Sequence, residues 1–398
     1  MTPTPSAHPA PAARMPAGIT LLLAFACGLV VANLYYAQPL AGPIGAVLGL
    51  HPGGTGLIVT LTQVGYGLGL LFIVPLGDLV ETRKLVRTLI VLAGAALLAA
   101  GLARSPAPFL AAMLCVGLAS VAAQVLVPYA AHLAPDEHRG AVVGNVMSGL
   151  MLGIMLARPA ASLVAQLASW HLVFFLSALA MGALALLLGV ALPPRAPVAT
   201  MGYGALLRSM GRLAVHSVVL RRRALYHAAM FGAFSVFWTI APLVLARGWH
   251  LSQGGIALFA LAGVAGAIAS PIAGRLADAG RTRPATACAM LAVVAAYGLT
   301  AVARPDTTSG LVLMGVAGIV LDFGVTTNIV LGQRAIFALG AEIRSRVNGI
   351  YMATFFAGGA IGSALGGLAF AHGGWPLTAG LGGALPLLAL AYFATERP

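Results

Sequence analysis

The stretch RGAVVGNVMSGLMLGIMLARPAASLVAQLASW at residues 139–170 returns in the same register as RSRVNGIYMATFFAGGAIGSALGGLAFAHGGW at residues 344–375. Both stretches are apolar and carry small residues at matching positions. A repeat separated by this much sequence indicates a duplicated unit and not a local motif. Identical residues in the shared register include Arg139 with Arg344, Val142 with Val347, Gly144 with Gly349, Met147 with Met352, Gly153 with Gly358, and Trp170 with Trp375.

The composition indicates a membrane protein. Of the 398 residues, 60% are apolar and 8% are charged, whereas a soluble domain carries about 25% charged residues. Apolar runs of about 18 residues or more recur along the chain, and as helices they are long enough to cross roughly 30 Å of hydrocarbon. Lipid offers no partners to backbone groups, so these runs must be α-helices. We expect twelve spans: 17–40, 54–76, 85–103, 107–131, 141–167, 170–192, 224–246, 252–273, 284–303, 309–333, 347–371 and 375–394.

The repeat and the twelve spans together predict an all-α membrane protein with two pseudo-symmetric six-helix bundles. Parallel repeats of this kind are related by an axis along the membrane normal. The segment between the halves begins with Pro193-Pro194 and is rich in arginine. It is expected to be a basic, partly helical linker, or simply a connector that contacts water or lipid headgroups. The predicted divisions are a disordered tail at 1–16, a first bundle at 17–192, the linker at 193–223 and a second bundle at 224–398.

Lysine and arginine are unevenly divided between the two sides of the predicted membrane protein. With the amino terminus inside, 18 lie on the inner side, and only Arg104, Arg247 and Arg304 lie outside. Positive residues concentrate in cytoplasmic loops. We therefore expect both termini in the cytoplasm and a multi-pass location in a bacterial-type inner (plasma) membrane. The net charge of +13 is then a topology signal, and no nucleic-acid partner is expected.

The sequence does not group residues for catalysis or metal binding. Cys27, Cys115 and Cys288 fall inside apolar runs, where cysteine behaves as a small hydrophobe. No histidine-rich cluster, nucleophile elbow or carboxylate pair occurs at membrane depth. We expect no enzyme activity, no metal and no cofactor. A membrane enzyme or a channel stays a remote alternative, since pores are usually built from rings of groups in an oligomer, while internal pseudo-symmetry favours a monomeric carrier.

The loop after the second span of each half resembles a motif of the major facilitator superfamily, Gly-x-Leu-Ala-Asp-Arg-x-Gly-Arg-Lys. Residues 274–281 read GRLADAGR, and residues 77–84 read GDLVETRK. The resemblance covers essentially the full chain and implies the major facilitator fold. It also implies a cytoplasmic gate in which carboxylates contact arginines and helix ends; a plain positive-inside loop is the alternative. The expected gating residues are Gly77, Asp78, Arg83, Lys84, Gly274, Asp278, Gly280 and Arg281.

The repeated stretches resemble the family's glycine-rich antiporter signature. Small residues at this spacing let helix backbones approach closely in lipid. Arg158 stands where the signature has proline, and Met113 stands where the family has an arginine associated with proton coupling. Residues 33–40, NLYYAQPL, resemble the bacterial drug-efflux and arabinose-efflux-permease-like branch. The expected helix-packing glycines are Gly144, Gly153, Gly349, Gly358, Gly362, Gly366 and Gly367.

Two charged residues lie deep inside predicted spans. Arg158 is about 25 Å and Asp322 about 18 Å from the inner ends of their helices, at 1.5 Å per residue. A charge at a helix centre costs roughly 2.5–3.5 kcal/mol on insertion scales, so each needs a reason. Three hypotheses remain open. Arg158 binds a polar or anionic solute while Asp322 carries a proton, the two form a salt bridge between the halves, or each is satisfied locally by carbonyls or water.

Polar residues form stripes on several predicted spans. In the family that the chain resembles, helices 1, 4, 7 and 10 line the central cavity, and polar stripes on membrane helices face such cavities. The seventh expected span, 224–246, also carries Phe231, Phe234 and Trp238 on one face, either as a ligand surface or as ordinary packing. A glutamine alone also serves as an interhelical hydrogen-bond partner. The expected substrate and proton pathway is Arg158, Asp322, Asn33, Tyr36, Gln38, Gln63, Gln124, Trp238, Thr326 and Gln333.

The sequence therefore predicts a secondary active transporter that moves small organic solutes by alternating access. A proton-coupled exporter of the drug or sugar efflux type is the first hypothesis, and a proton-coupled importer or a uniporter of a small metabolite is the alternative. The expected partners are a small-molecule substrate, protons and the lipid bilayer, and the expected oligomeric state is a monomer.

Overall fold

The computed structural model describes residues 16–135, 138–194, 197 and 201–396, and these residues form helices and short connections without strands. The first half contains α1 (Ala17–Ala32), α2 (Ala41–Leu48), α3 (Gly56–Phe72), α4 (Thr82–Leu102), α5 (Pro106–Ser120), α6 (Ala122–Leu133), α7 (Arg139–Leu167) and α8 (Trp170–Ala191). The second contains α9 (Tyr203–His216), α10 (Val218–Gly248), α11 (Gln253–Ala260), α12 (Gly266–Asp278), α13 (Thr282–Ala301), α14 (Thr308–Phe337) and α15 (Arg344–Ala394). Short 3₁₀ turns lie at η1 (Pro52–Gly54), η2 (Val74–Asp78), η4 (Leu261–Ala265) and η5 (Ala341–Ile343).

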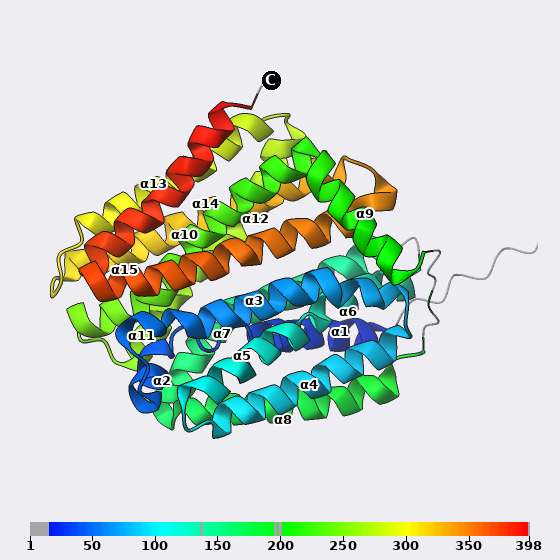
Figure 1. Cartoon of the computed structure of the whole chain (residues 1–398), viewed down its shortest axis with the longest axis horizontal. Coiled ribbons are helices and arrows are strands. Elements are labelled where there is room, and N and C mark those ends of the chain that lie inside the picture. The colour runs from blue at the N-terminus through cyan, green and yellow to red at the C-terminus, as the bar shows by residue number, and fades with distance from the viewer. Residues whose placement is uncertain (1–15, 136–137, 195–196, 198–200, 397–398) are drawn as a thin grey trace, which may run out of the picture.

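The prediction of a twelve-helix membrane fold is confirmed. In the described ranges, 10 helical stretches are long and apolar enough to cross a membrane, and α1 is a shorter apolar helix. The stretch α15 holds two predicted spans, because Gly373 and Gly374 leave helical geometry in its middle, with φ at Gly374 of 61°. Positive φ costs little for glycine, so the chain turns there without a separate loop. Figure 1 shows the helices in two groups, α1 to α8 with α11 and the remaining helices of the second half.

Two helix boundaries differ from those expected. The first span was predicted to reach residue 40, but α1 ends at Ala32 and residues 33–40 form turns. Pro39 has no amide hydrogen for the carbonyl of Tyr35, and the Gln38 amide bonds that carbonyl instead, at 3.3 Å. In the second half, α10 begins at Val218 and not at 224, because Ser217 caps it by accepting a hydrogen bond from the Leu220 amide. The predicted tail at 1–16 lies outside the described residues except for Pro16.

Closely packed glycines join equivalent helices in the two halves. A Cβ on Gly153 of α7 would overlap the backbone of Gly28 on α1. In the second half, a Cβ on Gly362 of α15 would overlap Gly232 on α10, and Gly358 lies equally close to Ala228. Only residues without side chains allow helices to approach this closely. The duplicated pattern in the sequence therefore appears as a duplicated helix contact.

The expected packing glycines are not equally close to neighbouring helices. An added Cβ on Gly366 would lie 3.4 Å from Val236 of α10, and one on Gly367 would lie 3.0 Å from the Gly53 carbonyl of η1 and 3.2 Å from Gly56 of α3. Gly349 is looser, since its nearest neighbour is Met210 of α9 at 3.5 Å. Gly144 has no neighbour within 4 Å of an added Cβ. Its position near the start of α7 thus serves no helix contact in this structure.

The two halves meet most closely at one end of the molecule. We call the end that carries α9 the linker end and the opposite end, with α2 and α11, the far end (Figure 1). Toward the far end, Ser363 Oγ donates to the Gly56 carbonyl at 3.0 Å, and the Gly254 amide donates to Gln166 Oε1 at 3.1 Å. At the linker end, α9 adds a contact through its Tyr203 hydroxyl, which donates to the Phe72 carbonyl at 2.8 Å. There α3 and α15 approach less closely, with Leu70 O 3.9 Å from an added Cβ on Gly349, whereas at the far end an added Cβ on Gly56 would overlap Ser363 O.

Candidate functional site

Arg158 lies inside the protein in the second half of α7. The residue is 5% exposed, and its guanidinium lies over three aromatic rings. The distance from Cζ to the ring centroid is 4.3 Å for Trp238, 5.1 Å for Phe234 and 5.5 Å for Tyr35. Among the described residues, Nε has no hydrogen-bond partner and the guanidinium makes no hydrogen bond. Ring faces therefore hold this cation, each worth about 2 kcal/mol when desolvated.

Asp322 lies at a similar depth in α14, on the opposite half. It is also 5% exposed. The indole Nε1 of Trp238 donates a hydrogen bond to its Oδ1 at 2.8 Å. The same indole thus binds the carboxylate with its edge and the guanidinium with its face. This arrangement uses the positive edge and the negative face of the ring, as the quadrupole of an aromatic group requires.

Gly263, in the 3₁₀ turn η4 between α11 and α12, leaves the space in which these groups meet. A Cβ on Gly263 would lie 2.9 Å from Asp322 Oδ2, 3.1 Å from Arg158 Nη1 and 3.4 Å from Trp238 Cζ2. Arg158 and Asp322 therefore face each other across this glycine, although no ion pair within 4.0 Å joins them in the described part of the chain. We call Arg158, Trp238, Gly263 and Asp322 the central site.

Three of the predicted pathway residues thus come together: Arg158, Asp322 and Trp238. Two contributors were not predicted. Tyr35, and not its neighbour Tyr36, lies beside Arg158. Gly263 matters because it has no side chain and leaves room for the charged groups. The only signal for it in the sequence is a run of alanine, glycine and valine at 262–267.

Gln63 forms a separate contact between the halves. Its Nε2 donates to Ser235 Oγ of α10 at 3.0 Å, while its Oε1 has no partner among the described residues. Two other predicted residues bond within the first half. Gln124 donates to the Tyr66 hydroxyl at 3.1 Å, and Asn33 lies 3.5 Å from the Met181 sulfur. The Gln124 contact matches the interhelical hydrogen bond that was the alternative for a glutamine.

The remaining predicted pathway residues lie outside the central site. Tyr36 is partly buried beside Ser177 of α8. Gln38 is 1% exposed, and neither polar atom of its side chain has a partner within the described ranges. Thr326 is partly buried one turn beyond Asp322. Gln333 lies near the linker end, where its amide is 3.5 Å from Asn348 Oδ1.

A second buried polar group lies nearer the linker end and was not predicted. His227 of α10 is fully buried between the rings of Tyr351 and Phe355, with centroid distances of 4.3 Å and 4.1 Å. Its Nδ1 is 3.5 Å from the Asn328 amide, and its Nε2 has no partner among described atoms. Stacked rings account for its burial, so it is first of all a core residue.

The expected gating loops are bonded within each half in this conformation. Asp278 forms an ion pair with Arg334 of α14. In the other half, Glu81 pairs with Lys84 at 3.1 Å and with Arg83 at 3.4 Å, and Arg83 also donates to the Leu192 carbonyl at 3.2 Å. Asp78 is exposed, and Gly280 has φ of 71° in the turn before α13. Of the two expected carboxylates, Asp278 thus contacts an arginine, although one of the same half, while among the described residues of the first half the contacts are made by Glu81 and not by Asp78. The other expected gating residues are Gly274, Gly77 and Arg281. No described atom lies within 4 Å of a Cβ added to Gly274, a Cβ added to Gly77 would lie 3.4 Å from Val125 Cγ1, and Arg281 is exposed.

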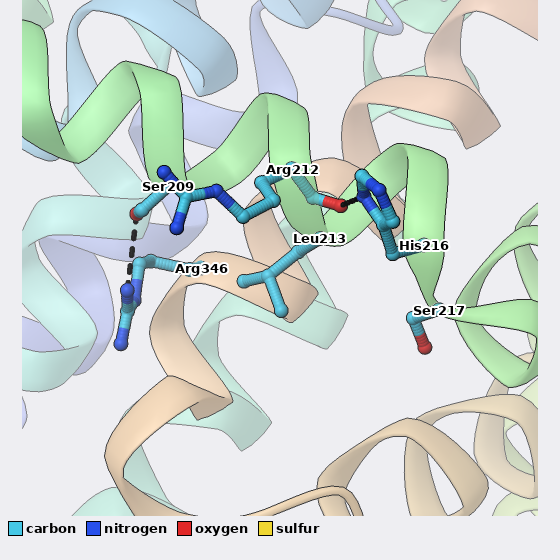
Figure 2. A pocket seen from close by; sticks show the side chains of 6 residues that line it. All are labelled: Ser209, Arg212, Leu213, His216, Ser217 and Arg346. Atoms are coloured by element: carbon cyan, nitrogen blue, oxygen red, sulfur yellow. Dashed lines mark hydrogen bonds between the residues drawn. The ribbon is translucent and has the colours of Figure 1, made fainter.

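A hollow of about 460 Å³ lies at the linker end, away from the central site. Figure 2 shows Arg346 of α15 turned toward Ser209 of α9, with Nη1 donating to Oγ at 3.0 Å. Arg212 and His216 line it from the same side of α9. It contains none of the predicted pathway residues, and its walls are the linker helix and the start of α15. Groups of three or more possible metal ligands are absent from the described residues.

The two pseudo-symmetric bundles, with buried opposite charges at their junction, define a multi-pass membrane protein of the carrier class. A sequence model described as the Major Facilitator Superfamily matches residues 20–330 and 224–398. The chain belongs to the major facilitator superfamily, and it is a membrane transporter.

The relatives agree with this assignment. The chain is 37% identical over 358 residues to the uncharacterized transporter YgaY of Escherichia coli O157:H7, covering 90% of each chain. It is 32% identical over 407 residues to the probable transporter SCO4007 of Streptomyces coelicolor, covering 100% of this chain and 93% of that one. A solved bacterial homologue of the human lysosomal transporter Spinster, inward-facing and occupied, has a TM-score of 0.77 at 15% identity, covering 95% and 96% of the two chains. That likeness shows the fold alone.

Proposed function

We propose that this chain carries small organic solutes across a bacterial inner membrane by alternating access, coupled to protons. One observation carries the proposal: Arg158 of the first half and Asp322 of the second face each other at Gly263 inside the apolar interior. Buried charges at a helix centre are costly and occur mainly where they serve transport. A site shared by both halves changes shape whenever the halves rock against each other, so binding and motion are linked.

The proposed cycle begins from the conformation described above. In this conformation the halves are joined at the far end by contacts such as Ser363 with Gly56. If both termini are cytoplasmic, as the distribution of lysine and arginine predicts, the linker end faces the cytoplasm, and in the proposed cycle the solute enters from that side. Rocking of the halves then separates α3 from α15 at the far end and opens the site outward. The partners of Asp278 and Arg83 must change or move with their halves during this step.

Proton coupling is assigned to Asp322. It is the one carboxylate at membrane depth among the described residues, and burial disfavours its charged form unless a partner compensates. When Asp322 faces Arg158 the pair is electrically neutral, which favours the ionised carboxylate. When a solute draws Arg158 away, the isolated carboxylate gains by taking a proton.

Two directions of coupling follow from the charge of the solute. A neutral or cationic solute that bonds to ionised Asp322 competes with a proton, which gives export in exchange for protons, the first hypothesis from the sequence, with solutes of the drug or sugar type. An anionic solute binds Arg158 and leaves Asp322 free to accept a proton, which gives uptake together with protons. This second candidate is favoured by the lack of any hydrogen-bond acceptor at Arg158 among the described residues.

Solute-driven proton movement tests the proposed function. Purified protein in liposomes that contain a pH-sensitive dye is challenged with a panel of sugars, amino acids, organic acids and lipophilic cations. We expect at least one class of solute to move protons, with the sign of the pH change giving the direction. Arg158→Ala is expected to abolish this movement while the protein remains folded in the membrane. Flux that ignores an imposed pH gradient would rule out proton coupling, and unaltered flux in the variant would remove Arg158 from the mechanism.

A further inference from the structure

The guanidinium of Arg158 lacks the acceptors that a buried arginine normally has. An arginine presents five N–H donors in a planar fork that suits a carboxylate. Arg158 is 5% exposed, yet it donates no hydrogen bond to any residue that the structure describes. Leaving a buried charged donor unpaired is costly, because it forgoes its bonds to water without replacing them. A fork kept unpaired at this depth is ready for an acceptor that arrives from outside the chain.

The neighbours of Arg158 define what kind of acceptor fits. Trp238, Phe234 and Tyr35 present ring faces to the guanidinium. Beyond Phe234 the aromatic surface continues through Phe231, 5.1 Å away, to Phe356. A ligand that reaches the fork must therefore lie against aromatic faces. Flat apolar groups stack favourably on such surfaces.

We propose that the central site binds a small organic monoanion, with its carboxylate on the Arg158 fork and a flat apolar body against the aromatic side chains beside it, Trp238, Phe234 and Tyr35. This assignment of substrate class rests on the proposed transport function. The carboxylate replaces Asp322 as the anion facing Arg158, and the ring faces replace water around the rest of the solute. Charge-assisted, two-pronged contacts of this kind are stronger than neutral hydrogen bonds.

The charge balance of the site adds a consequence. The ionisable groups that face Asp322 are Arg158 from α7 and Tyr35 from the turn after α1. Among the described residues, the neighbouring elements add no other charge beside Asp322. On α10 the neighbour is the Trp238 indole, which does not titrate, and on η4 it is Gly263, which has no side chain. The Tyr297 hydroxyl of α13 donates to the Ala233 carbonyl instead. His227 of α10 and Tyr351 of α15 lie near Asn328, more than a turn farther along α14. A second anion beside Asp322 is therefore balanced by one proton, taken from water onto the Asp322 carboxylate.

Calorimetric binding to the purified, full-length protein tests this inference. The probes are benzoate, phenylacetate and cinnamate, each compared with its uncharged amide, between about pH 6 and pH 8, where all three acids are ionised. We expect at least one acid to bind about tenfold or more tightly than its amide, as a charge-assisted pair predicts. Its affinity should rise as the pH falls, with uptake of about one proton per anion measured from buffers of different ionisation enthalpy.

Three variants separate the central site from other sources of the signal. Arg158→Gln should remove the preference for the acid over the amide. Asp322→Asn should bind the acid more tightly than the wild type and without dependence on pH, because the competing carboxylate is gone; a purely structural role of Asp322 predicts neither change. Arg346→Gln, in the basic hollow at the linker end, is the matched control and should leave binding unchanged. Circular dichroism of each variant verifies folding.

Several results would overturn the inference. They are equal binding of every acid and its amide, an acid preference that survives Arg158→Gln, or an acid preference lost in Arg346→Gln. The proposed transport function fails separately, when no solute of any charge moves protons in the liposome assay. A neutral solute that moves protons through Arg158 would uphold that function while refuting the anion site.

Discussion

At the scale of single residues, the central site depends on groups that share one indole. Trp238 bonds Asp322 through Nε1 and supports the Arg158 guanidinium on its face. The two charges are thereby held close without direct contact, and each remains available to a third partner. A direct, two-pronged salt bridge would be harder to open, since separating a buried pair costs several kcal/mol. The indole thus holds the two charged groups near each other but unpaired, so that a bound solute or a proton changes the partner of each.

The first prediction concerns Gly263. Replacing it with alanine places a methyl group 2.9 Å from Asp322 Oδ2 and 3.1 Å from Arg158 Nη1. The two nearest atoms are ends of flexible side chains, so we expect the protein to fold with a loss of stability near the low end of the roughly 1–3 kcal/mol range of overpacked cores. Solute affinity should fall by about tenfold or more, because the added methyl occupies space where the solute meets both charges. Transport kinetics measure it, with Gly298→Ala in open space as control; equal kinetics in both variants would contradict the geometry of the site.

The residues of this site differ in how far sequence could predict them. Arg158 and Asp322 are visible because a charge within an apolar run is rare and costly. Trp238 follows from helical periodicity on its face. Tyr35 and Gly263 could not be found this way. Which side Tyr35 faces depends on the end of α1 at Ala32, and the role of Gly263 depends on a local 3₁₀ turn that small residues permit but do not specify.

At the scale of helices, backbone contact at glycine replaces the hydrophobic effect that drives packing in water. Lipid is as apolar as a leucine side chain, so helices associate through close van der Waals contact. The pair α10 and α15 meets in this way where Gly358 and Gly362 face Ala228 and Gly232. The pair α1 and α7 repeats the contact at Gly28 and Gly153. These rigid pairs are suited to move as units.

The second prediction tests this packing. Gly358→Leu forces a side chain into the backbone of Ala228, so we expect a loss of about 1–3 kcal/mol in stability, as for overpacked cores. Gly144→Leu is the matched control, because nothing lies within 4 Å of its added Cβ. Thermal unfolding in detergent is the measurement. A control that melts as early as Gly358→Leu would show that the cost comes from glycine replacement itself and not from helix contact.

Helix number and order were predictable from apolar runs, while helix ends were not. Each expected span contains a helix, since lipid leaves the backbone no alternative. The early start of α10 at Val218 and the break of α15 at Gly373 depend on single groups, a capping hydroxyl at Ser217 and glycine backbone at 373–374. The early end of α1 at Ala32 depends on tight turns over residues 33–40. Hydrophobicity averaged over many residues does not detect such single groups, so it does not predict where a helix ends.

At the scale of the whole molecule, the two halves must separate at the far end for the central site to open there. The third prediction uses this contact. A Cβ on Gly254 would lie 3.8 Å from Gln166 Cγ, so cysteines at 166 and 254 lie side by side across the two halves and are candidates for a cross-link. After Cys27, Cys115 and Cys288 are replaced by serine, we expect oxidation of this pair to stop transport and a reductant to restore it. Flux in proteoliposomes before and after oxidation measures the effect.

The control for this cross-link lies within one half. Cysteines at 94 and 181 join α4 to α8, where a Cβ on Gly94 would lie 3.2 Å from Met181 Cβ. Because both helices belong to the first half, oxidation of this pair should leave transport unchanged. Transport that continues with the 166–254 pair fully cross-linked would refute the proposed opening of the far end.

The most direct test of the central claim, that Arg158 and Asp322 act together as the site where solute and proton meet, is the flux of Asp322→Asn in proteoliposomes. The variant keeps the shape of the side chain and the bond from the Trp238 indole but has no titrating carboxylate. The account predicts that flux driven by a pH gradient is lost, while exchange of solute for solute across the membrane persists. Proton-driven flux at the wild-type rate in this variant would contradict it.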